Sequence, residues 1–136
     1  MKTTSFVFLV AMFIASGTAY SSEQGLKALE TNLSNIIYCK EYVMRDEAVI
    51  PSLNETTAPL CDKAYQNFKA AVAENLTEYT QTEMEKGARV LVEATYMMQG
   101  EQRFYMKDFA NFPLELKASE LPRCLRICNH FASLEH

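Results

Sequence analysis

Residues 121–128 read Leu-Pro-Arg-Cys-Leu-Arg-Ile-Cys, and the spacing of the two cysteines here is the strongest constraint on the predicted fold. Cys124 and Cys128 are four residues apart, so in a helix their side chains project from the same face. Two cysteines with parallel Cβ directions cannot be joined to each other unless the helix unwinds. We therefore expect each of them to be bonded to a different helix elsewhere in the chain.

The remaining cysteines, Cys39 and Cys61, complete an even set, which in an exported chain favours structural disulfides. In an up-down-up-down bundle the last helix runs antiparallel to the first helix and parallel to the second. If the first helix extends to about Glu47, Cys39 lies ~12 Å from that end, at ~1.5 Å per residue, and so deeper than Cys61. This depth predicts the nested pairs Cys39–Cys128 and Cys61–Cys124, whereas a last helix of opposite direction would swap the partners.

A zinc site is the alternative use of the segment that holds Cys124, Cys128 and His130, because cysteine and histidine are common zinc ligands. The spacing argues against zinc, since the two cysteines lack the two-residue separation of a knuckle and His130 lies on a different helical face from Cys128. Export to an oxidising compartment disfavours free thiolates further. We therefore expect disulfides, with no metal and no cofactor.

Apolar residues recur at the three-and-four spacing of amphipathic helices along most of the chain, and alternating strand patterns do not persist. A capping box from Thr80 to Glu83 marks the start of a third helix, although one long bent helix across this point also fits. Gly100 is expected to stop that helix, and Pro122 to lie in the first turn of the last one. The predicted helices cover 21–48, 60–75, 80–100, 104–112 and 119–131. The predicted fold is all-α: a disulfide-stapled up-down-up-down helical bundle of four to five helices.

The first 19 residues have the layout of a secretory signal peptide, with basic Lys2, an unbroken apolar run and small residues before a cleavage point after Ala19. The apolar run is shorter than the roughly 20 residues of a membrane span. We therefore expect a single helical domain over 20–136 that is secreted, extracellular and free of the membrane once the signal is removed. The end of the chain, 134–136, fits either a native terminus or the junction before a purification tag.

Three Asn-x-Ser/Thr triplets, at Asn32, Asn54 and Asn75, are predicted acceptors for N-glycans and agree with export. Asn54 lies in a loop predicted over 51–59, where prolines, threonines and short polar residues are concentrated. Asn75 lies at the edge of the second predicted helix, so either that helix ends there or this triplet carries no sugar.

The charge of the chain bears on its partners. The formal net charge is −4, and the densest basic pair is Arg123 with Arg126. Nucleic acids and anionic membranes attract clustered positive charge. We therefore expect neither of them as a partner.

Motifs for catalysis are missing from the sequence: it contains no Gly-rich phosphate loop, no His-Glu-x-x-His zinc motif and no Gly-x-Ser-x-Gly nucleophile turn. With His130 as the one dependable histidine, acid–base catalysis would rest on carboxylates such as Glu83 and Glu85, which point in different directions on a helix. We expect a protein that is not an enzyme.

The segment Tyr96–Phe112 is crowded with methionine and aromatic residues, more than one helical stripe can bury. It either fills the core or lines a pocket or an exposed contact surface, because these side chains suit adaptable binding surfaces. We expect a secreted protein that binds another protein as a ligand, effector or inhibitor. The alternative is an extracellular carrier of an apolar small molecule, such as a fatty acid or odorant-like compound, with this segment as pocket wall. The candidate ligand-binding residues are Phe68, Met84, Met98, Phe104, Tyr105, Met106 and Phe109.

Overall fold

The computed structural model describes residues 23–49, 59–74 and 79–134. The predicted signal peptide and its cleavage point lie outside these residues. The elements, in chain order, are α1 (Glu23–Glu41), the 3-10 helix η2 (Val43–Arg45), α2 (Leu60–Ala73), α3 (Gln81–Ala94), β1 (Tyr96–Gln99), β2 (Gln102–Tyr105), the 3-10 helix η3 (Met106–Asn111) and α4 (Leu114–Ala132). The prediction of a disulfide-stapled helical bundle is confirmed.

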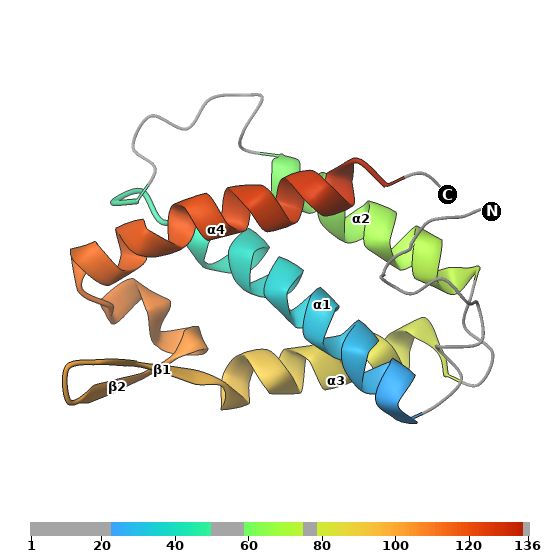
Figure 1. Cartoon of the computed structure of the whole chain (residues 1–136), viewed down its shortest axis with the longest axis horizontal. Coiled ribbons are helices and arrows are strands. Elements are labelled where there is room, and N and C mark those ends of the chain that lie inside the picture. The colour runs from blue at the N-terminus through green and yellow to red at the C-terminus, as the bar shows by residue number, and fades with distance from the viewer. Residues whose placement is uncertain (1–22, 50–58, 75–78, 135–136) are drawn as a thin grey trace.

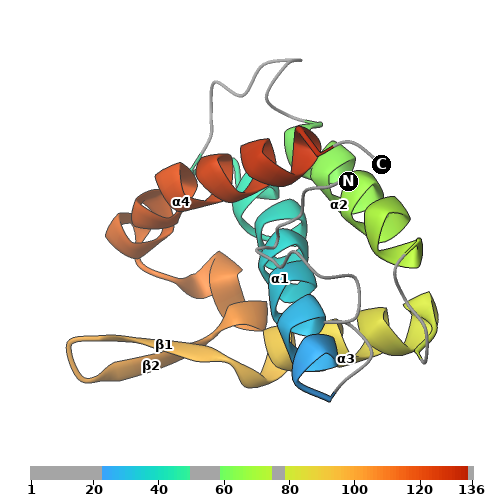
Figure 2. The ribbon, with the colours of Figure 1, turned by 45° about the vertical axis from the view of Figure 1, so that its right-hand side comes forward.

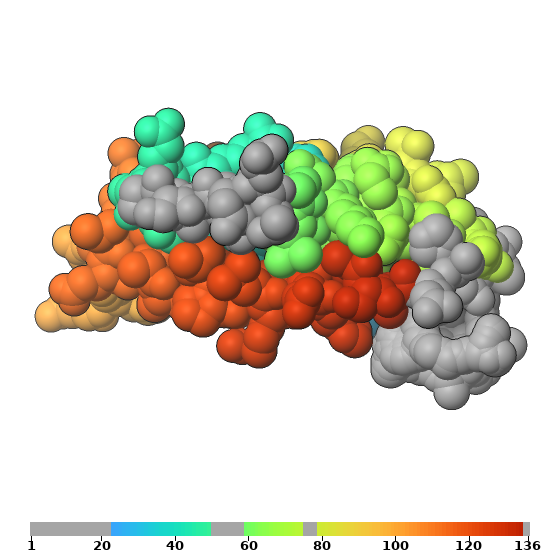
Figure 3. Space-filling view, turned by 90° about the horizontal axis from the view of Figure 1, so that it is seen from above, coloured from blue at the N-terminus to red at the C-terminus, as the bar shows by residue number. Residues whose placement is uncertain are grey.

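Helix α1 is the centre of the bundle. It packs against α3 on one side and against α2 and α4 on the other, and α2 and α4 also pack against each other (Figure 1). Turning the molecule shows the same sandwich, with α1 between α3 and the α2–α4 pair (Figure 2). From above, α4 runs along one face of the molecule beside α2 (Figure 3).

The core follows from the apolar stripe of α1. Leu29, Leu33, Ile36 and Ile37 repeat at three-and-four spacing, and each is at most 1% exposed. Such a stripe places one side of a helix in the core while polar residues cover the other. No helix in the described part of the chain is long and apolar enough to cross a membrane.

The capping box at the start of α3 is confirmed. The backbone N–H of Glu83 donates to the Thr80 hydroxyl over 3.1 Å, and the backbone N–H of Thr80 donates to the Glu83 carboxylate over 2.8 Å. Thr80 has extended backbone angles, so α2 and α3 are separate helices and the alternative of one long bent helix is wrong. Local sequence was sufficient here because both partners of the box lie within one turn.

The first helix is shorter than predicted, ending at Glu41 rather than near Ala48. The apolar spacing continues through Val43 and Met44, which are both buried, but they lie in the 3-10 turn η2. Asp46 fixes this turn from both sides. One of its carboxylate oxygens accepts a hydrogen bond from the backbone N–H of Ala48 over 3.0 Å, and the other lies 2.9 Å from Nζ of Lys117 on α4.

The last helix begins at Leu114 rather than at Ser119, so Pro122 lies inside α4 and not in its first turn. The Ser119 hydroxyl does not cap the helix; it donates to the backbone carbonyl of Leu116 over 2.7 Å. A proline removes the hydrogen bond to the carbonyl four residues earlier, here that of Ala118. Pro122 and Ala118 are both exposed, so water can reach that carbonyl.

A β-hairpin replaces the end of the third predicted helix. Helix α3 ends at Ala94, and β1 and β2 then pair antiparallel, with Tyr96 opposite Tyr105 and Met98 opposite Arg103. Gly100 has a φ of +61°, which glycine adopts without strain, so it makes the hairpin turn instead of stopping a helix. The helix predicted over 104–112 is likewise replaced by β2 and the shorter η3.

The disulfides join α4 to two different helices, as predicted, but the predicted partners are wrong. The bonds are Cys39–Cys124, between α1 and α4, and Cys61–Cys128, between α2 and α4. All four cysteines are therefore in disulfides, and Cys124 and Cys128 offer no thiolate to the zinc alternative. Two structural disulfides indicate an oxidising, extracellular-type compartment.

The predicted direction of α4 holds even though the partners are swapped. Asp46 follows Cys39 in the sequence, whereas its ion-pair partner Lys117 precedes Cys124. The two segments therefore run in opposite directions, and α1 and α4 are antiparallel. Asn67 follows Cys61 in α2 and donates to the carbonyl of Ala132, which follows Cys128 in α4. The two helices therefore run parallel.

The depth argument failed because it extended α1 to Glu47. The α-helix ends at Glu41, so Cys39 lies in its last turn and faces the middle of α4. Cys61, in the first turn of α2, is bonded to Cys128, one turn further along α4 than Cys124.

Candidate functional site

The outer face of the hairpin is the main exposed apolar feature of the 96–112 segment. Tyr96, Met98 and Tyr105 are 45%, 53% and 47% exposed. Antiparallel pairing places them on one face together with Arg103, because side chains alternate along each strand. We call these four residues the hairpin face.

The hairpin face is organised by ring contacts. The rings of Tyr96 and Tyr105 lie 5.6 Å apart between centroids, and the Arg103 guanidinium lies 5.5 Å from the centre of the Tyr96 ring. An arginine over an aromatic face is attracted to the ring quadrupole. The side chains are thus arranged with respect to one another before any partner binds.

The opposite face of the hairpin anchors it to the core. Phe104 packs on Phe112 at 5.1 Å between ring centroids, and Phe112 packs on Phe109 at 5.0 Å. Phe109 is 1% exposed and meets the ring of Tyr38 on α1 edge to face at 5.9 Å. This chain of rings connects a surface hairpin to the central helix and holds the hairpin face in a fixed position.

The candidate ligand-binding residues do not share one pocket. Phe68 and Met84 are fully buried core residues of α2 and α3, and Phe109 is the buried residue of η3. Met98 and Tyr105 lie on the hairpin face instead. The other two candidates are half-buried: Phe104 lies on the inner side of the hairpin, and Met106 lines a cavity.

Arg103 belongs to the site but was not among the sequence candidates. Its neighbour across the hairpin, Met98, was a candidate, but Arg103 joins it only once the strands are paired. The signal was present in Gly100 and Glu101, which can form a two-residue hairpin turn between two runs of strand-forming residues. The interpretation of Gly100 as a helix stop hid that signal.

A partly open cavity of about 180 Å³ lies between α1 and α3, next to the base of the hairpin. It is lined by residues of α1 between Thr31 and Tyr38, by residues between Leu91 and Thr95 at the end of α3, and by Met106. Its walls are mixed: hydroxyl and amide groups come from α1, whereas Leu91, Val92 and Met106 give an apolar side.

Tyr38 lies beside this cavity in a buried polar cluster. Arg123 of α4 donates to the Asn35 amide oxygen over 2.9 Å and pairs with the Glu120 carboxylate at 3.2 Å. The Tyr38 hydroxyl is buried beside the Glu120 carboxylate, and the Arg123 guanidinium lies 6.0 Å from the centre of the Tyr38 ring. Burial, followed by the negative charge of Glu120, raises the pKa of Tyr38 above its ordinary value, so the hydroxyl stays protonated.

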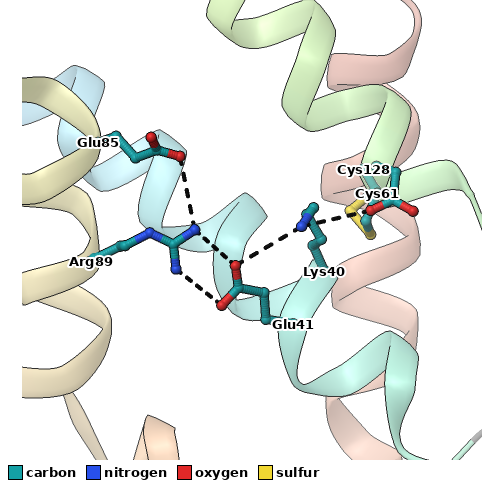
Figure 4. Close-up of polar contacts among 7 residues, drawn as sticks. Lys40, Glu41, Cys61, Glu85, Arg89 and Cys128 are labelled. Carbon is teal, nitrogen blue, oxygen red and sulfur yellow. Dashed lines mark hydrogen bonds and ion pairs between the residues drawn. A yellow bond between two sulfur atoms is a disulfide. The ribbon is translucent and has the colours of Figure 1, made fainter. Parts of the chain in front are cut away.

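A second polar cluster joins three helices on the surface (Figure 4). Arg89 of α3 lies 2.9 Å from the Glu41 carboxylate of α1 and 3.8 Å from Glu85, and Lys40 reaches both Glu41 and Asp62 of α2. The hydrogen bond that the Arg89 guanidinium donates to Glu41 raises the pKa of Arg89, although burial opposes this. These charges satisfy one another at the surface, so we read the cluster as a set of helix-to-helix contacts.

The predicted glycosylation sites are only partly within the described residues. Asn32 lies in the middle of α1 and is half-buried, next to the fully buried Leu33. Asn54 and Asn75 lie outside the described residues, and so does the predicted loop over 51–59 except for Pro59.

No protein-family model, curated protein or solved structure matches this chain. What the molecule does must therefore be argued from its own surfaces.

Proposed function

We propose that this protein works outside the cell as a non-enzymatic binding protein, of ligand, effector or inhibitor type, and that the hairpin face contacts its protein partner. The observation that carries this proposal is the group of half-exposed tyrosine and methionine side chains on a hairpin that is anchored to the core. Tyrosine, methionine and arginine are enriched in protein interfaces relative to other surfaces.

The energetics favour such a surface. A few residues carry most of the binding energy of an interface, and tyrosine and arginine are prominent among them. A side chain that is already held in place loses little conformational entropy on binding. Tyr96, Tyr105 and Arg103 meet this condition through their mutual ring and cation contacts.

Secretion supports the same proposal. The layout of the first 19 residues and the three glycosylation triplets are those of an exported glycoprotein. Both disulfides agree with an oxidising destination. A protein-binding role needs no cofactor and no catalytic group, and the proposal invokes neither.

The alternative role as a carrier of a fatty acid or odorant-like compound has less support from the geometry. Ligand sites for such molecules enclose roughly 300–1,000 Å³. The candidates Phe68 and Met84 lie in the packed core, and Met98 and Tyr105 face solvent, so they do not form the walls of one such cavity.

The test compares three purified proteins immobilised in the oxidised form and exposed to extracellular fluid of the source. They are the unchanged chain, the double variant Tyr96→Ser/Tyr105→Ser, and the control Val90→Ser. Val90 is an exposed apolar residue on α3, 60% exposed, outside the hairpin face. The partner is the protein retained by the unchanged chain and by the control, and the double variant should bind that purified protein at least about thirtyfold more weakly, as expected for loss of hot-spot residues.

Thermal unfolding of the same three proteins separates binding from folding. The replaced tyrosines are half-exposed, so each variant should lose less than about 1 kcal/mol of stability. If the double variant retains the same proteins with the same affinity as the unchanged chain, the hairpin face is not the binding surface and the proposal is wrong.

A further inference from the structure

The backbone of β1 has an outer edge, on the side away from β2. Hydrogen-bonded and non-hydrogen-bonded residue pairs alternate along an antiparallel ladder. The backbone N–H of Met106 donates to the carbonyl of Thr95 over 3.2 Å, so these two residues form a hydrogen-bonded pair of the ladder. Counting from this pair, Tyr96 and Met98 occupy non-hydrogen-bonded positions. Their backbone N–H and C=O groups therefore point away from β2, and we call these groups the β1 edge.

The β1 edge is open. Its N–H and C=O groups have no hydrogen-bond partner among the residues that the structure describes. The hairpin projects from the end of α3 on the side of the molecule remote from α2 (Figure 2). Edge strands are often protected from pairing by charged side chains or proline. The strand β1 reads Tyr-Met-Met-Gln and has neither, so its edge is a template on which another extended chain can pair.

Arg103 indicates the chemistry of the chain that would pair there. This residue belongs to β2, but its guanidinium lies 5.5 Å from the centre of the Tyr96 ring on β1. Arg103 is exposed and forms no ion pair with a carboxylate of the described residues. A guanidinium stacked on a ring can still donate its N–H fork to a carboxylate. An acidic side chain on a strand beside β1 is the partner that this charge favours.

We infer that the partner of the hairpin face is an acidic, extended protein segment, which adds to the β1 edge as a third strand and brings a carboxylate to Arg103. The inference rests on the proposed function, because it states how the same surface is bound. In strand addition, backbone hydrogen bonds provide affinity and alternate side chains provide specificity. Tyr96 and Met98 contribute to both, since their side chains lie on the hairpin face and their backbone groups form the edge.

The probe is a phage-displayed library of random octapeptides, selected on the immobilised oxidised protein. The enriched peptides should carry Asp or Glu with apolar or β-branched residues at alternate positions, the pattern of an extended strand. One enriched peptide is then synthesised and titrated against each variant. Arg103→Gln should bind this peptide about three- to tenfold more weakly, because it removes the charge and leaves the β1 edge in place.

Met98→Pro tests the backbone directly, because it removes one outward N–H. Proline is tolerated in an edge strand where the N–H faces solvent, and this N–H is not used by the ladder of the hairpin. The matched control is Met98→Ala, which loses the same side chain and keeps the N–H. The peptide should bind Met98→Pro at least about tenfold more weakly than Met98→Ala, since its own carbonyl loses a donor.

Hydrogen exchange is a second test, and it needs no substitution. In the free protein, the amides of Met97 and Gln99 should exchange more slowly than those of Tyr96 and Met98, because they bond to β2. The bound peptide should slow the exchange of the Tyr96 and Met98 amides selectively, because these two amides then donate to the added strand.

Three results would overturn the inference. The first is the failure of acidic peptides to be enriched. The second is equal binding of the peptide by Met98→Pro and Met98→Ala, with no slowing of the outward amides. The third is a dimer in sedimentation in which these amides are already protected, because a second copy of the chain would then occupy the edge.

The outcomes also separate this inference from the proposed function. If the peptide is lost in Tyr96→Ser/Tyr105→Ser but binds Met98→Pro as well as Met98→Ala, the hairpin face binds without strand addition and only the inference fails. If the peptide adds to the β1 edge while the protein retained from extracellular fluid ignores the double tyrosine variant, the proposed function fails.

Discussion

Two regions of the molecule are held together by different means. The stapled region, formed by α1, α2 and α4, is crossed by two disulfides and the Asp46–Lys117 ion pair. The α3–hairpin region, formed by α3, β1, β2 and η3, has no disulfide to the rest of the molecule within the described residues. Packing and the exposed contact of Arg89 with Glu41 hold it in place. Covalent stabilisation is therefore concentrated in one region, and the proposed binding surface lies in the other.

This difference has a consequence for local stability. Surface ion pairs contribute only about 0–1 kcal/mol each, whereas the packed faces of α3, at Met84, Ala88 and Val92, bury apolar surface against α1. The α3–hairpin region should open more readily than the stapled region. Hydrogen exchange is the measurement that ranks the two.

The largest effect is expected from removing a disulfide of the stapled region. The double variant Cys39→Ala/Cys124→Ala removes a bond that closes a sequence separation of 85 residues. In the chain-entropy model such a bond contributes about 4 kcal/mol. Urea unfolding should show a loss near that size, and exchange in α1 and α4 should rise toward the level of α3.

The matched variant Cys61→Ala/Cys128→Ala removes the second bond, with a separation of 67 residues, and should cost nearly as much because the loop term grows only slowly with length. A loss below about 1 kcal/mol in both variants would contradict the view that the disulfides set the stability of this region.

A smaller effect is expected from Lys117→Met. Nζ of Lys117 lies 2.9 Å from the Asp46 carboxylate, and the two side chains are 10% and 12% exposed. Removing one partner of a fully buried pair costs about 3–5 kcal/mol, and the remaining exposure should reduce this to about 2–3 kcal/mol in urea unfolding.

The control for that variant is the double change Asp46→Asn/Lys117→Met. Asparagine keeps an oxygen for the backbone N–H of Ala48 and removes the unpaired charge. It should recover most of the lost stability. If Lys117→Met alone is neutral, the ion pair does not hold η2 against α4.

The smallest effect is expected in the α3–hairpin region. Thr80→Ala removes the N-cap of α3 and should cost about 1 kcal/mol, with faster exchange confined to α3 and the hairpin. Thr82→Ala, an exposed change in the first turn of the same helix, is the control. Equal exchange in the two variants would show that the box does not stabilise α3.

The same cap predicts a pH dependence. Hydrogen bonds from Thr80 lower the pKa of Glu83 below its ordinary value of 4.5. A carboxyl with a lowered pKa stabilises the folded state above its unfolded pKa, and this contribution is lost as the pH falls through the folded value. The stability of α3 should therefore decline below about pH 4.5 in the unchanged chain and less so in Thr80→Ala.

Features that depend on neighbours in the sequence could be predicted. The capping box needs only Thr80 and Glu83, and the core stripe of α1 needs only the spacing of Leu29, Leu33 and Ile36. The parallel orientation of Cys124 and Cys128, which prevents a bond between them, also followed from helix geometry alone. These inferences gave the helical class and the two-helix attachment of α4.

Features that depend on tertiary contacts could not be predicted. The end of α1 is set by Asp46, whose partner Lys117 is far along the chain, and the disulfide partners changed with that end. The hairpin face needs Arg103 beside Tyr96, which only strand pairing provides. The position of the Tyr38 hydroxyl beside Glu120 also depends on how α4 packs against α1.

The attachment of both disulfides to α4 has a consequence for how the protein matures. In a chain that enters an oxidising compartment with its N-terminus first, Cys39 and Cys61 arrive before either native partner. Until α4 follows, the only intramolecular bond they can form is with each other, and that bond must later be broken by thiol–disulfide exchange. In such a chain, correct cross-linking waits until α4 has followed, and until then the two early thiols must stay reduced or their bond must be reshuffled.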